Sequence, residues 1–91
     1  MSLLDDGAVA AELAAAPGWE RDGDAIVRTV ELADFRAAMD FVNRVAGLAE
    51  AADHHPDITI RWNKVTLTLS THSAGGLTRK DFDLARSIDA R

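Results

Sequence analysis

Residues 34–69 decide the fold of this 91-residue chain, and they read DFRAAMDFVNRVAGLAEAADHHPDITIRWNKVTLTL. The first half of this stretch carries apolar residues at the i, i+3, i+4, i+7 spacing of an amphipathic helix, which predicts a helix over residues 34–52. The expected apolar face of this helix consists of Phe35, Ala38, Met39, Val42, Val45, Ala46 and Ala49. Pro56 requires the helix to end, because the residue before a proline avoids the helical region.

The second half of the stretch alternates apolar and polar residues with the period of a β-strand. One alternating set runs from Ile58 to Trp62, and another set of opposite parity runs from Val65 to Leu69. The parity changes across Asn63-Lys64, which indicates a turn or a bulge at that point. We therefore expect the two strands to form a hairpin.

Toward the N-terminus, the sequence predicts one helix and one more hairpin. Asp5 or Asp6 can cap a first helix, which Pro17-Gly18 ends. A strand at residues 19–21 and a longer strand at residues 25–31 then flank an Asp-Gly turn signal.

Toward the C-terminus, residues 73–76 are expected to form a loop before a last helix. Thr78 and Asp81 stand at the spacing of a capping box, in which each side chain bonds to the backbone of the other residue. Ala85 and Ile88 continue the buried face of this helix.

The resulting order of elements is α-β-β-α-β-β-α, and we predict the α+β class. Two hairpins that alternate with helices suggest a single two-layer domain over residues 1–91, with a four-stranded antiparallel sheet and the helices packed on one face. The free face or an edge of the sheet can then serve self-association. A domain of this size has a small core, so we expect a homodimer or a homotetramer.

Composition excludes several classes of function. Ten basic and fifteen acidic residues give a net charge of −5, which argues against nucleic-acid binding and against binding to an anionic membrane. Cysteine is absent, so disulfides and thiol catalysis are excluded. The sequence shows neither a membrane-length apolar run nor a basic leader, and we expect a cytoplasmic protein.

The three histidines of the chain, His54, His55 and His72, all lie within one 19-residue stretch. An imidazole has an ordinary pKa of about 6.5, so these groups can give or take a proton at neutral pH. Adjacent residues of an extended chain point to opposite sides, so His54 and His55 share a pocket only if the backbone bends near them. A helix-to-strand junction can supply that bend, and the hairpin can return His72 to it.

Glu50 or Asp53 can orient one of the imidazoles and favour its charged form. Trp62 offers a flat face for a planar heterocycle. Taken together, these residues suggest a cleft for proton transfer on a heterocyclic substrate.

The stretch from Glu50 to Asp81 closely resembles pterin-4a-carbinolamine dehydratase. The shared pattern is an acid, a His-His-Pro triplet, an aromatic residue, a further histidine and an acid after a loop. In this chain these are Glu50, His54-His55-Pro56, Trp62, His72 and Asp81. The strings Asn63-Lys64-Val65, Leu69-Ser70-Thr71-His72 and Gly76-Leu77-Thr78 are also similar to the family.

The resemblance implies dehydration of 4a-hydroxytetrahydropterin to quinonoid dihydropterin, which recycles the cofactor of aromatic amino acid hydroxylases. It implies a catalytic set of His54, His55 and His72, in which His54 and His72 are the acid/base pair and His55 holds and orients the pterin. Glu50, Asp53, Pro56, Trp62, Ser70 and Thr71 are then expected to bind the substrate, the last two through the backbone. The resemblance implies no metal and no cofactor, because the pterin is the substrate.

Several alternatives stay open. The histidines could be loop residues that cap helix carbonyls, or His54 and His72 could bind zinc with a carboxylate. Trp62 could belong to the core instead of the pocket wall, and Asp81 has a structural explanation in the capping box. Some members of the family act as dimerisation cofactors of a transcription factor and some distant relatives as assembly chaperones, so a non-catalytic module on the same fold is the alternative function.

Overall fold

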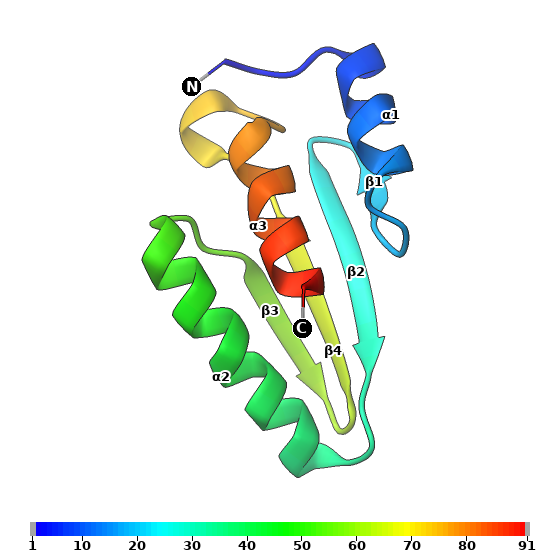
Figure 1. Cartoon of the computed structure of the whole chain (residues 1–91), viewed down its shortest axis with the longest axis vertical. Helices are drawn as coiled ribbons and strands as arrows, with labels where there is room; N and C mark the ends of the chain where they lie inside the picture. The colour runs from blue at the N-terminus through cyan, green and yellow to red at the C-terminus, as the bar shows by residue number, and fades with distance from the viewer. Residues whose placement is uncertain (1, 91) are drawn as a thin grey trace.

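The computed structural model describes residues 2–90, in which three helices lie on one side of a four-stranded antiparallel sheet (Figure 1). The elements are α1 (Asp6–Ala14), β1 (Glu20–Asp22), β2 (Ala25–Glu31), α2 (Phe35–Ala52), β3 (Asp57–Arg61), β4 (Lys64–Leu69), the 3₁₀ turn η1 (His72–Ala74) and α3 (Arg79–Asp89). The predicted α+β class and the order of the elements are confirmed. Within residues 2–90, no helix has both the length and the apolar character needed to cross a membrane.

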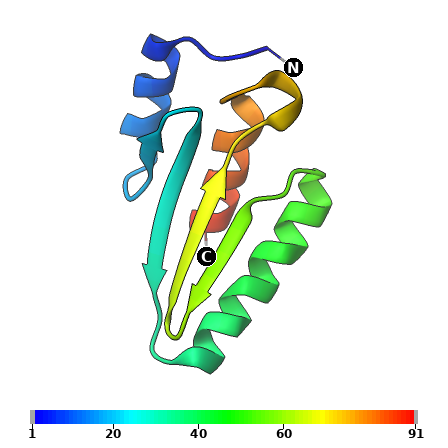
Figure 2. The ribbon, with the colours of Figure 1, turned by 180° about the vertical axis from the view of Figure 1, so that it is seen from behind.

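The sheet joins the two hairpins through their inner strands, in the order β1-β2-β4-β3. The join is antiparallel, with Ile26 opposite Leu69 and Val30 opposite Val65. Figure 2 views the sheet from the side without helices, where β2 and β4 lie in the middle and α3 behind them. As a result β1 and β3 are the edge strands.

The core lies between the sheet and the helices. Val65, Leu67 and Leu69 are completely buried, as their alternation in the sequence predicts. The opposite face of β4 carries threonines, and Thr66 bonds there to Thr29 of β2 through their hydroxyl groups at 2.9 Å. The helix-covered face is therefore apolar, whereas the free face is polar.

The apolar face of α2 differs in part from the predicted one. Ala38, Val45 and Ala49 are buried as expected, but Phe35 is 52% exposed and Ala46 is also exposed. Phe41, which the predicted face omitted, is buried instead. Only part of the apolar face of α2 is therefore covered by the rest of the protein. β3 is the edge strand, and the apolar face of the helix is wider than the surface that covers it.

The β3–β4 hairpin turns at Trp62-Asn63, one residue before the change of parity in the sequence. Trp62 adopts the left-handed conformation with φ of 52°. The Asn63 side chain donates a hydrogen bond to the Leu32 carbonyl at 2.9 Å, and the Leu32 amide donates to the Asn63 carbonyl at 2.8 Å. These bonds hold the hairpin tip against the segment that leads into α2.

Candidate functional site

The structure brings all three histidines to one cavity, with His54 and His55 reaching it from the end of α2 and His72 from the end of β4. The cavity has a volume of about 260 Å³. Its walls are formed by Asp53, His54, His55, Ser70, Thr71, His72, Ser73 and Lys80. The cavity is therefore polar and rich in groups that can exchange protons.

Asp53 supplies the bend that lets neighbouring histidines share this cavity. It ends α2 in the left-handed conformation, with φ of 50° and ψ of 45°. The next amide, that of His54, returns to the Ala49 carbonyl at 3.1 Å, which closes the end of the helix. The chain then leaves toward β3 through Pro56, so the two imidazoles do not alternate as in a regular strand.

His54 is the buried histidine of the three, and a buried carboxylate holds it. Its Nε2 lies 2.6 Å from Oδ1 of Asp81, whose side chain is fully buried. The second oxygen of Asp81 accepts the backbone amide of Thr78 and the hydroxyl of Thr71, both at 2.9 Å. Asp81 thus completes the predicted capping box of α3 and also orients His54.

The hydrogen bonds around Asp81 have one consistent direction. The Lys80 amide donates to the Thr78 hydroxyl, which lies 2.8 Å from the Thr71 hydroxyl. When Thr78 donates to Thr71, Thr71 can donate to Asp81, and every hydroxyl proton has an acceptor. As a carboxylate, Asp81 only accepts hydrogen bonds, so His54 donates through Nε2, and in its neutral form it carries its lone pair on Nδ1.

His55 and His72 have more solvent contact. Nε2 of His55 bonds to Oε2 of Glu50, one helical turn back on α2, and both side chains are more than half exposed. His72 is exposed at the start of η1. Of the two carboxylates that the sequence offered as imidazole partners, Glu50 pairs with His55, whereas Asp53 lines the cavity.

Ser70 and Thr71 also line the cavity, but much of their hydrogen-bonding capacity is already used. The Ser70 hydroxyl donates to the Asp24 carbonyl at 2.7 Å. The Thr71 amide donates to the Gly76 carbonyl, and the Thr71 carbonyl accepts the Ala74 and Gly75 amides. The expected contact between this backbone and the pterin edge therefore depends on Ser70 and His72 more than on Thr71.

Trp62 does not reach the cavity, contrary to the expectation of a stacking wall. It lies in the turn between β3 and β4, at the opposite end of β3 from His55, and the residue is 66% exposed. The alternative of a core tryptophan does not hold either. The turn begins at this residue, so Trp62 does not continue the alternating pattern of β3.

Two residues of the site were not assigned to it from the sequence. Lys80 and Ser73 line the cavity. Neither residue belongs to a sequence motif that would have assigned it to the site. The position of Lys80, directly before the capping-box acid Asp81, is the signal that could have placed it near His54. Within residues 2–90, no three His, Asp or Glu side chains are arranged to hold a metal ion, so the zinc alternative lacks a ligand set there.

Comparison with known proteins gives a family match over nearly the whole chain. The family model described as "Pterin 4 alpha carbinolamine dehydratase" matches residues 2–91. Two proteins named "Putative pterin-4-alpha-carbinolamine dehydratase" are each 60% identical to this chain. The protein from Thermomicrobium roseum aligns over 97% of this chain and 95% of its own length, and that from Nocardia farcinica over 96% and 92%.

Two solved structures share the fold. A transcriptional coactivator/pterin dehydratase from Brucella melitensis superposes with a TM-score of 0.92 and 36% identity, covering 96% of this chain and 95% of that one. A pterin dehydratase-like protein, identified as a RuBisCO assembly factor in the alpha-carboxysome, has a TM-score of 0.64 and 19% identity, covering 79% and 83%. The second likeness shows the fold alone.

Proposed function

This chain belongs to the pterin-4a-carbinolamine dehydratase family, and we propose that it dehydrates 4a-hydroxytetrahydropterin to quinonoid dihydropterin and water. The observation that carries the proposal is the meeting of three imidazoles in one cavity, one of them oriented by a buried carboxylate. In this function the chain recycles the cofactor of aromatic amino acid hydroxylases. The pterin is its substrate, and the proposed reaction uses neither a metal nor a further cofactor.

The proposed reaction needs one base and one acid. Nδ1 of His54 accepts the proton of N5, and the electron pair of that N–H bond forms the new double bond between N5 and C4a. The bond between C4a and its hydroxyl group breaks, and His72 protonates the departing oxygen to give water. The geometry supports this division of roles, because Asp81 keeps a proton on Nε2 of His54 and stabilises the imidazolium that forms.

The other residues of the site hold the substrate in this scheme. His55, fixed by Glu50, orients the pterin ring, and Asp53 presents its carboxylate at the same cavity. Pro56 keeps the chain direction after the histidine pair. These are positioning roles, so their loss should weaken binding of the pterin more than it slows the chemical step.

A stopped-flow ultraviolet assay of 4a-hydroxytetrahydropterin dehydration tests the proposal. We expect the wild-type chain to exceed the spontaneous rate, and His54→Ala and His72→Ala each to lower kcat by about 10²–10⁴-fold. Thr59→Ala, an exposed change in β3, is the matched control and should keep the wild-type rate. A wild-type chain that shows only the spontaneous rate contradicts the function, and active histidine variants contradict the roles.

The alternative is a non-catalytic module, such as a dimerisation, assembly or transcriptional cofactor. The name of the Brucella melitensis structure joins both kinds of role. The meeting of three imidazoles in one polar cavity favours the enzyme, because titratable groups gather at catalytic sites. The stopped-flow assay separates the two, since a pure module leaves the spontaneous rate unchanged.

Self-association, as a homodimer or homotetramer, is proposed as well. Four of the five residues of the edge strand β3 are exposed, which leaves this edge open to a second chain. A cytoplasmic location, and partners that include neither nucleic acid nor membranes, remain predictions from composition.

A further inference from the structure

Thr71 is a buried polar residue of the site, and the proposed reaction gives its side chain no part. It directly precedes His72 in the chain, and only 4% of its surface is exposed. Its hydroxyl lies 2.8 Å from that of Thr78 and donates to Oδ2 of Asp81 at 2.9 Å. Asp81 in turn holds His54, so one short hydrogen-bonded path runs from His54 to the residue beside His72.

The direction of the Thr71 hydroxyl departs from the local rule for the start of a helical turn. Thr71 is the N-cap residue of η1, and a threonine at that position ordinarily accepts a backbone amide of its own turn. Here the side chain makes no capping bond to η1 and bonds instead to Thr78 and Asp81 at the start of α3. Local rules are broken mostly at functional or strained sites, so this hydroxyl points to a task beyond the turn.

The loop that presents His72 closes on Thr71. A bridge joins Thr71 to Gly76, and the Thr71 carbonyl accepts the amides of Ala74 and Gly75, both at 3.0 Å. His72 itself is exposed, so packing in the core does not hold its side chain. The place of His72 therefore depends on how Thr71 is fixed, and its buried hydroxyl fixes it to α3.

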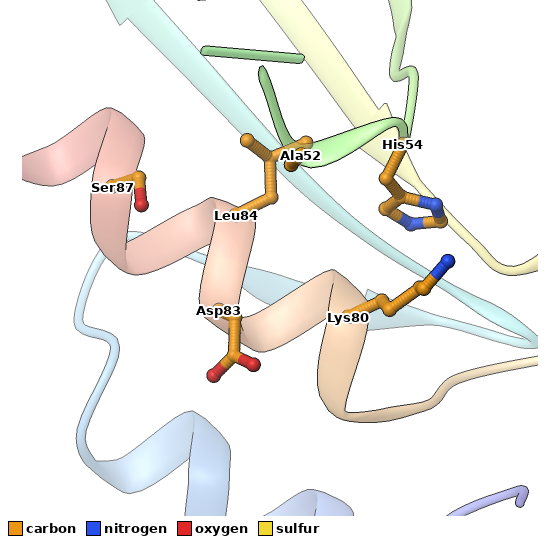
Figure 3. A pocket seen from close by; sticks show the side chains of 6 residues that line it. All are labelled: Ala52, His54, Lys80, Asp83, Leu84 and Ser87. Carbon is orange, nitrogen blue, oxygen red and sulfur yellow. The ribbon is translucent and has the colours of Figure 1, made fainter. Parts of the chain in front are cut away.

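His54 is held from the same point. Figure 3 shows its ring between the end of α2, which carries Ala52, and the first turn of α3, which carries Lys80. Nε2 of His54 lies 2.6 Å from Oδ1 of Asp81, the residue after Lys80. The two oxygens of one carboxylate thus determine the place of His54 and the place of the loop with His72.

We propose that Thr71 is a positioning residue, which sets the separation of His54 and His72 through Asp81. The inference rests on the proposed function, in which these two histidines are the base and the acid of one dehydration. Both must reach the same substrate at once, because N5 and C4a are bonded to each other. A misplacement of about 1 Å can cost about 10²-fold in rate, so the separation has to be held firmly.

Two valine variants test the role, because valine has the shape of threonine without the hydroxyl. Thr71→Val removes the bond to Asp81, whereas Thr78→Val, the matched control, removes the other hydroxyl of the buried pair and keeps its amide on Asp81. In the stopped-flow assay we expect Thr71→Val to lower kcat by about 10–100-fold. Its KM should stay within about threefold, because His55 and Glu50 are untouched, and Thr78→Val should keep kcat within about threefold.

A serine and a cysteine variant separate the hydroxyl from packing. Thr71→Ser keeps a hydroxyl that donates to Asp81, and its kcat should stay within about threefold of the wild type. Thr71→Cys differs from the serine variant by one atom, and its S–H is a weak donor, so its kcat should be lower than that of Thr71→Ser by about fivefold or more. This pair decides the question if Thr71→Val does not fold.

Amide hydrogen exchange, followed by NMR, reports the anchor without any substrate. The Ala74 and Gly75 amides bond to the Thr71 carbonyl, so in Thr71→Val they should exchange about tenfold faster than in the wild type. In Thr78→Val these two amides should stay within about threefold of the wild type, whereas the Lys80 amide, which loses its capping hydroxyl, should exchange faster.

The outcomes separate the positioning role from the function. Equal losses of kcat in Thr71→Val and Thr78→Val, equal rates of the serine and cysteine variants, or unchanged exchange of the loop in Thr71→Val each overturn the role while the activity of the wild type stands. A wild-type chain that shows only the spontaneous rate overturns the proposed function and, with it, the positioning role for this reaction.

Discussion

Asp81 combines two tasks that the sequence presents as alternatives. Its Oδ2 accepts the Thr78 amide as part of the capping box, and its Oδ1 holds His54 at 2.6 Å. A carboxylate has two oxygens with several acceptor sites, so both tasks fit one residue. The pattern of Thr78 and Asp81 revealed the cap because that contact is local. The bond to His54 spans 27 residues and depends on how α3 docks beside the end of α2.

We expect Asp81→Asn to reduce both catalysis and stability. The amide keeps one acceptor oxygen but turns an NH₂ group toward either His54 or the Thr71 and Thr78 donors, so one side of the network loses its partner. The free energy of unfolding should fall by about 1–3 kcal/mol, measured by urea denaturation. The kcat should fall by about 10²-fold or more with little change in KM, because His54 loses the acceptor that fixes its tautomer.

Thr78→Val is the control that separates the two effects. It removes the capping hydroxyl but leaves the contact between His54 and Asp81, so it should cost about 0.5–2 kcal/mol of stability. Its kcat should stay close to that of the wild type. If Asp81→Asn and Thr78→Val lower kcat to the same extent, Asp81 acts through the fold and not through His54.

At the scale of the elements, local patterns predicted the helices and strands, and the docking of those elements determined exposure. The alternation of Val65, Leu67 and Leu69 identified the buried face of β4, because one face of this central strand packs on the core and the other points away from it. Ile60 of β3 shares the alternation of Ile58, yet it is 38% exposed because β3 is an edge strand. Which strand lies at the edge depends on the pairing of β2 with β4, and alternation within a single strand does not encode that pairing.

The β3–β4 turn offers a test of the position of Trp62. A left-handed φ of 52° favours glycine and disfavours a β-branched residue. Both Trp62→Gly and Trp62→Val remove the indole, so the preference for a positive φ dominates the difference between them. We expect the glycine variant to be more stable than the valine variant by about 1–2 kcal/mol in thermal or urea unfolding.

The Trp62→Gly variant also tests whether Trp62 takes part in the reaction. The histidine cavity lies at the other end of β3, so folded Trp62→Gly should dehydrate the pterin at the wild-type rate. A loss of kcat/KM by tenfold or more in this variant would restore the stacking role that the sequence suggested for Trp62.

At the scale of the whole molecule, distant parts of the chain meet at Asp89, the last residue of α3. The buried indole of Trp19 donates from Nε1 to both carboxylate oxygens, at 3.0 and 3.2 Å. Arg28 of β2 approaches Oδ1 of the same carboxylate at 2.5 Å. This cluster ties the segment before β1, the sheet and the C-terminal helix together. No short-range pattern predicts it, because its members lie 61 and 70 residues apart.

We expect Asp89→Asn to destabilise the fold while leaving the chemistry intact. The side chains of Arg28 and Asp89 are each 26% exposed, so solvent screens their ion pair only in part. The free energy of unfolding should fall by about 1–3 kcal/mol, because a half-buried guanidinium and an indole N–H lose the shared carboxylate.

Trp19→Phe should lower the free energy of unfolding by less. If one network is involved, the two losses should fall short of additivity by about 0.5–1.5 kcal/mol in the double variant. Additive losses in this cycle would contradict a shared network. Asp81 and His54 lie at the other end of α3, so kcat measured well below the unfolding midpoint should match the wild type in both single variants.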